Sequence, residues 1–95
     1  MPDEPILREM ARAAIQRRKL PSRRPDRMWS GPGVGAECTL CGEPIGIDQF
    51  ECEIQFAHER RTSPIRPIDT FRLHLRCLAA WEFERVQIAE RRSDR

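Results

Sequence analysis

The sequence predicts one small α+β domain, because alternating segments are followed by a segment with helical periodicity. In residues 50–58 apolar side chains alternate with mostly polar ones, which is typical of a strand with one buried face. Residues 70–74 alternate again after a stretch that contains two prolines, so the two segments predict a β-hairpin. From Leu75 the apolar spacing lengthens to that of a helix with apolar side chains on two sides. We expect this helix to pack against other parts of the chain on both sides.

Length and composition limit what such a domain can be. The chain has 95 residues, of which 39% are hydrophobic and 6% are aromatic. A chain of this length buries a modest share of its surface, so its apolar core supplies little stability. It also leaves little room for a deep catalytic pocket. We therefore expect a further stabilising element, and the four cysteines are the candidates for it.

A shorter amphipathic helix is predicted over residues 5–19, ahead of the hairpin. Pro5 suits the first turn of a helix and Pro21 ends the pattern. A helix of this length is marginal in isolation, so it must dock on the rest of the chain or fray. Residues 21–36 hold three prolines and three glycines and predict a linker, from which Trp29 is expected to pack back onto the domain. The residues that fall at helical spacing are Leu7, Met10, Ala11, Ala14 and Arg18.

Charge divides the chain into a basic arm over residues 1–30, a domain over residues 31–92 and a frayed tail over residues 93–95. The arm carries eight basic and four acidic side chains, whereas the whole chain has a net charge of +2. Basic arms bind phosphates of DNA or RNA, although many are only solvated surface. The candidate nucleic-acid-binding residues are Arg17, Arg18, Lys19, Arg23, Arg24 and Arg27.

Three cysteines and one histidine form a metal-ligand pattern. Cys38 and Cys41 are separated by two residues, and Gly42 after them lets the chain turn so that both thiolates face one ion. His74 and Cys77 form a second pair at i and i+3, which we expect on one face of the first turn of the C-terminal helix. The helix N-terminus favours a thiolate at Cys77. This Cys3His set is typical of a closed, structural Zn²⁺ site.

The order of these parts resembles a treble-clef zinc finger. A C-x-x-C motif, thirty-two residues and then H-x-x-C is similar to the first zinc module of LIM domains and to zinc fingers of the poly(ADP-ribose) polymerase type. The resemblance implies a zinc knuckle, a hairpin and a helix around one structural ion. It covers Cys38 to about Trp81 and rests on the four ligands, Gly42, Ile45, Ile47 and Leu78.

The chain also departs from both families. No second set of four ligands follows Cys77 as in LIM domains, and Leu73 stands where the polymerase-type fingers carry an aromatic residue before the histidine. Neither the partner choice of LIM domains nor the recognition of DNA breaks therefore carries over to this chain.

Other assignments of the cysteines remain open. Cys38 and Cys41 also match a redox motif, but that motif opens a helix, and Gly42 and Pro44 disfavour a helix here. An iron–sulfur cluster is a further alternative.

The remaining sulfur and nitrogen donors have assignments of their own. Cys52 lies on the apolar side of the predicted strand and is expected to be a buried thiol, with replacement of His74 as ligand as the alternative. His58 is expected to pack at the strand end, and replacement of His74 as a ligand is its alternative role as well. Trp81, one turn after the last ligand, is expected to shield the site from water, and Trp29 could do the same.

These features favour some functional classes over others. Four good ligands leave no open position for a metal-bound water, and no catalytic triad or paired-carboxylate motif is present, so we expect a protein that is not an enzyme. The glycine-rich run at 31–35 lacks the Lys-Ser/Thr ending of a phosphate-binding loop. No apolar run spans a membrane or resembles a secretory signal, so we expect a cytoplasmic protein. A protein partner is the first expectation, DNA or RNA binding through the arm and finger is the alternative, and no small-molecule substrate is evident.

Overall fold

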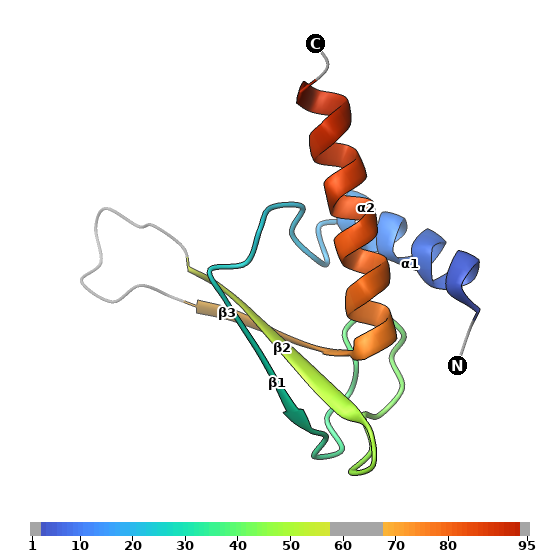
Figure 1. Cartoon of the computed structure of the whole chain (residues 1–95), viewed down its shortest axis with the longest axis vertical. Coiled ribbons are helices and arrows are strands. Elements are labelled where there is room, and N and C mark those ends of the chain that lie inside the picture. The colour runs from blue at the N-terminus through green and yellow to red at the C-terminus, as the bar shows by residue number, and fades with distance from the viewer. Residues whose placement is uncertain (1–2, 58–67, 94–95) are drawn as a thin grey trace.

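The computed structural model describes residues 3–57 and 68–93 (Figure 1). Within them the chain forms two helices and one three-stranded antiparallel sheet with the strand order β1-β2-β3. Figure 1 shows α2 (Leu75–Ser93) rising from the end of β3, with α1 (Glu4–Gln16) crossing it. The predicted small α+β class is confirmed. Neither helix in this part of the chain is long and apolar enough to cross a membrane.

The predicted hairpin is present. Strands β2 (Phe50–Ala57) and β3 (Ile68–His74) pair antiparallel, with Cys52 opposite Leu73 and Ile54 opposite Phe71. The residues that connect them, 58–67, lie outside the described part of the chain. The helix expected from Leu75 begins at that residue.

The predicted linker is wrong in its second half, because strand β1 (Arg27–Pro32) forms there and pairs antiparallel with β2. Proline and glycine disfavour central strands, but β1 lies at the edge of the sheet and Pro32 is its last residue, where a missing amide proton is tolerated. The expectation that Trp29 packs back onto the domain is also wrong. Its side chain is 54% exposed on this edge strand.

Helix α1 docks on α2, which settles the choice between docking and fraying. Leu7, Ala11 and Ala14 are buried, as their helical spacing predicts, and the partly exposed Arg12 pairs with the buried Glu84 of α2 at 2.7 Å. The helix ends earlier than predicted, because Arg18 adopts a left-handed φ of 59° and the amides of the next two residues bond to the carbonyl oxygen of Ala14. This capping turn replaces the last predicted helical turn.

The main core lies between the inner face of the sheet and α2. Phe56 meets Phe71 and Trp81 edge to face, with ring centroids 5.9 and 6.2 Å apart. Trp81 is fully buried, and its indole N–H donates to the carbonyl oxygen of Pro21 at 2.9 Å. Leu20, just before that proline, is buried as well. The segment after α1 is therefore part of the core.

Candidate metal centre

The first ligand pair lies on a tight turn between β1 and β2. Gly42 has a φ of 79°, a left-handed conformation that favours glycine, and its amide donates to the carbonyl oxygen of Cys38 at 2.9 Å. The amide of Cys38 in turn donates to the carbonyl oxygen of Glu43 at 2.9 Å. These bonds close the knuckle that the C-x-x-C-G sequence predicts and hold both sulfurs on one side of it.

The chain just after the knuckle runs beside the chain just after β1. The amide of Gly35 donates to the carbonyl oxygen of Ile45, and the amide of Ile45 donates to that of Ala36, at 2.9 and 2.8 Å. At Gly33 the two backbones approach so closely that a Cβ atom would overlap the carbonyl oxygens of Ile45 and Gly46. Only glycine fits at this position, and the close contact holds the knuckle against the end of β1.

The second ligand pair is divided between two elements, which corrects the prediction that both members lie in the first helical turn. His74 is the last residue of β3, whereas Cys77 lies in the first turn of α2. The amide of Thr39 donates to the carbonyl oxygen of Arg72 at 2.8 Å, so the knuckle is bonded to the strand that ends in the histidine. The strand-to-helix junction therefore presents the second pair directly to the first.

The four predicted ligands come together as one cluster. The donor atoms of Cys38, Cys41, His74 and Cys77 all lie within 4.8 Å of one another. Nδ1 of His74 is 3.3 Å from the sulfur of Cys41 and 3.9 Å from that of Cys77. A tetrahedral ion with bonds of about 2.0–2.3 Å separates its donor atoms by roughly 3.3–3.8 Å, so the cluster needs only a small contraction to hold one. The arrangement could hold a metal ion.

The histidine ring is oriented for ligation through Nδ1. Its Nε2 lies 3.2 Å from the carbonyl oxygen of Pro44, which can only accept, so we assign the proton to Nε2. The lone pair then remains on Nδ1, which faces the sulfurs of Cys41 and Cys77. A backbone carbonyl that fixes the ring in this way is the usual outer support of a metal-bound histidine.

The acidities of the three thiols reflect their crowding. Contact with the Cys77 thiol lowers the pKa of Cys38 to about 4, and the same contact raises the pKa of Cys77. Burial raises the pKa of Cys41. One thiolate is thus stabilised by a neighbouring thiol, and the remaining protons must leave before all three sulfurs can bind a cation.

The other predicted sulfur and aromatic residues lie elsewhere. Cys52 is buried on β2, as expected, and does not belong to the cluster in the part of the chain that the structure describes. His58 falls outside the described residues. Trp29 is too exposed to shield the site as proposed. Trp81 is buried, and its aromatic and hydrogen-bond contacts are with Phe56, Arg85 and Pro21, so its shielding role stays a prediction.

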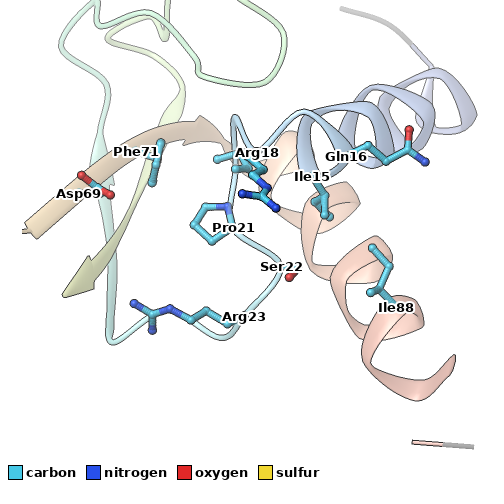
Figure 2. A pocket seen from close by; sticks show the side chains of 10 residues that line it. Ile15, Gln16, Arg18, Pro21, Ser22, Arg23, Asp69, Phe71 and Ile88 are labelled. Carbon is cyan, nitrogen blue, oxygen red and sulfur yellow. The ribbon is translucent and has the colours of Figure 1, made fainter. Parts of the chain in front are cut away.

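The predicted nucleic-acid-binding residues are divided among the linings of three cavities. Arg18 and Arg23 line a cavity of about 700 Å³ between α1, α2 and β3 (Figure 2). Arg24 and Arg27 line a second cleft with Arg85. Arg17 and Lys19 line a third, beside Leu40. Nucleic-acid binding through these six residues stays a prediction.

The cavity in Figure 2 is separate from the metal cluster. Its walls are largely apolar, and the figure shows Ile15, Phe71 and Ile88 around it together with the guanidinium of Arg18. No member of the Cys3His cluster lines it. The cluster itself was predictable from the ligand spacing alone, whereas nothing in the sequence pointed to this cavity.

A comparison with protein families, curated proteins and solved structures found no match to this chain. The arrangement of its own side chains therefore carries the functional argument.

Proposed function

We propose that this chain is a structural-zinc module of treble-clef type that binds another protein. The observation that carries the proposal is the convergence of three sulfurs and one imidazole nitrogen within 4.8 Å from two distant parts of the chain. Three of these four residues are buried and one is half-buried. Such a site holds an ion away from solvent and ties the knuckle to the junction of β3 and α2.

Zn²⁺ suits this donor set best. Cys3His with tetrahedral spacing is a common structural zinc site, and Ca²⁺ and Mg²⁺ prefer oxygen ligands instead. Four protein ligands leave no open coordination position for a substrate or an activated water, so the ion has no catalytic role in this proposal. The order of knuckle, hairpin and helix supports the treble-clef assignment.

The metal part is tested by measuring bound zinc per purified chain. We expect one Zn²⁺ per chain, and we expect Cys41→Ser and Cys77→Ser to lose most of it. Cys52→Ala is the matched control, because that cysteine is also buried but lies outside the cluster. Retention of a full zinc complement by Cys77→Ser would contradict the ligand assignment. Visible absorbance from bound iron in the purified chain would show that the site holds an iron–sulfur cluster and not zinc.

The proposal that this chain binds a protein rests on apolar side chains that are exposed on the sheet and on the segments next to its strands. Large hydrophobic residues at the surface mark interaction sites when they gather. On β1 Met28 and Trp29 are more than half exposed on opposite faces of the sheet, and the exposed Phe50 lies on the same face as Met28, opposite the end of that strand. Among the described residues, the other large hydrophobic ones with more than half of their surface exposed are Val34, Ile47, Ile68 and Leu75.

This part is tested by affinity capture with the zinc-loaded chain under nuclease treatment. We expect a stoichiometric protein partner that remains bound without nucleic acid and is lost with Trp29→Ser. Recovery of nucleic acid alone, with an affinity that falls steeply as salt is added, would favour the alternative function instead.

A further inference from the structure

The outer face of the sheet carries a feature that the metal site does not explain. We propose that this face binds a cationic side chain, an arginine or a lysine, in a segment of a partner protein. The inference deepens the proposed function and rests on it. The outer face is defined here as the side turned away from α2, formed by residues 27, 29 and 31 of β1, 51, 53 and 55 of β2, and 70 and 72 of β3.

Two carboxylates are buried on this face although no helix covers it. Glu51 and Glu53 are each 6% exposed. Of the two helices in the described part of the chain, only α2 contacts the sheet, and it packs on the other side. Across the sheet Glu53 lies between Trp29 and Arg72. Glu51 lies between Gly31 and His74. No helix of the described residues therefore covers either carboxylate.

A single guanidinium serves both carboxylates. Arg72 lies 3.7 Å from Oε2 of Glu51 and 3.5 Å from Oε1 of Glu53, and its own side chain is 46% exposed. The second oxygen of Glu51 is buried and has no hydrogen-bond partner. Buried carboxylates require compensation by cations or by hydrogen-bond donors. Two carboxylates thus share one paired guanidinium, and Arg27, the other cation of this face, forms no ion pair with either of them among the described residues.

Trp29 marks where a further cation would bind. Gly31 has no side chain, and the Trp29 ring leans over it, with one ring carbon 4.0 Å from the position of a Cβ at that glycine. The ring therefore lies toward Glu51, the residue opposite Gly31. Its exposed side faces solvent and attracts cations through the negative face of the aromatic system. Carboxylates behind the ring add to that attraction, because they make the local potential more negative.

The same arrangement disfavours a polyanion. A nucleotide base could stack on Trp29, but its phosphates would then lie beside two buried carboxylates. Arg27 is the nearby cation of β1, opposite Gln55, and no ion pair joins it to either glutamate among the described residues. It competes with an incoming arginine and would assist an incoming phosphate. Its removal therefore has opposite consequences for the two classes of partner.

The experiment is an amide and indole NMR titration of the zinc-loaded full chain with a short blocked peptide that alternates glycine and arginine. We expect the Trp29 indole signal to move, with that of the buried Trp81 as an unmoved internal reference. Trp29→Leu and Glu51→Gln should each weaken binding by about fivefold, and Arg27→Gln should tighten it. Met28→Leu, on the same strand but the other face, and Glu90→Gln, an exposed residue of α2, are the matched controls.

Three outcomes would overturn the proposal. The first is an unmoved Trp29 signal, and the second is equal binding of a peptide with glutamine in place of arginine. The third is displacement of the Trp29 signal by oligothymidylate with weaker binding after Arg27→Gln, which would assign the face to nucleic acid. Zinc content is measured on the same samples. If the chain carries one zinc ion but the peptide does not bind, only the proposed cation site is overturned. If the chain is folded but carries no zinc, the proposed function is overturned.

Discussion

The metal cluster and the helix pair hold the two ends of the molecule by different means. At the cluster the chain is mostly turns, held by backbone hydrogen bonds and by four metal-binding side chains, and Leu40 and Ile45 of the same segment are buried in the apolar core. At the helix pair Leu7 and Ala11 are buried against α2, and a partly buried ion pair joins Arg12 to Glu84. The first end adds a metal-binding set to its share of the apolar core, whereas the second depends on apolar burial and an ion pair that need no ligand.

The difference teaches how a short chain distributes its stability. Helix α2 belongs to both ends, because Cys77 lies in its first turn and Trp81 and Glu84 follow within the next two turns. Loss of the ion removes one support of this helix and leaves the other.

Removal of the metal should have the largest effect. Structural zinc sites contribute apparent binding free energies of about 10–16 kcal/mol to folding, more than the whole stability of most small domains. We expect chelation, or Cys77→Ser, to abolish the cooperative unfolding transition of residues 38–88 measured by circular dichroism. Cooperative unfolding that survives chelation would show that apolar burial suffices and would remove the distinction between the two ends.

Truncation of Trp81 should rank second, because it acts where the two supports meet. Trp81→Ala removes a fully buried ring and the hydrogen bond to the Pro21 carbonyl oxygen. We expect a loss of about 3–5 kcal/mol in the free energy of unfolding of the zinc-loaded chain, measured with denaturant. A loss below about 1 kcal/mol would mean that the segment after α1 contributes little to the core.

Leu7→Ala should weaken only the helix pair. The side chain is 1% exposed, so its truncation should cost about 2–4 kcal/mol while zinc content stays at one ion per chain. Ile6→Ala is the matched control, because its side chain is half exposed and should change stability by less than about 0.5 kcal/mol. Loss of zinc from Leu7→Ala would show that the two ends are not separable.

The smallest effect concerns Cys52, which lies between the two ends on β2. Burial, and then the charge of Glu51, raises the pKa of its thiol above the ordinary 9.0. The contribution of this thiol to the free energy of unfolding is therefore fully present below pH 9.0. It is lost as the pH rises toward the folded-state pKa of Cys52, by at most about 1.4 kcal/mol per pH unit. We expect Cys52→Ala to flatten the fall in stability of the zinc-loaded chain above that pH. An unchanged slope would contradict this.

The ligand cluster, the hairpin and the C-terminal helix were predictable because each depends on local spacing. Two x-x-spaced pairs are sufficient to identify the ligands, and alternation over residues 50–57 identifies β2. The position of His74 on β3 rather than in the helix could not be predicted, since helix boundaries depend on tertiary contacts such as the bond from Thr39 to Arg72.

Strand β1 was not predictable for a physical reason. Its sequence, with glycine and proline at positions 31 and 32, has low strand propensity, and its conformation comes from pairing with β2. The exposure of Trp29 and the burial of Glu51 and Glu53 follow from that third strand. They could not be predicted from a two-stranded hairpin.

The close approach at Gly33 has a consequence for cooperation between the two binding functions. Gly33 directly follows β1, and the backbone it contacts at Ile45 and Gly46 directly follows the knuckle. The backbone after β1 is therefore in direct contact with the backbone after the turn that carries two metal ligands. By thermodynamic reciprocity, a partner that binds more tightly to the metal-loaded chain must raise the affinity for the metal by the same factor. Measurement of zinc affinity with and without a bound partner would then show whether the close contact at Gly33 couples the two proposed sites.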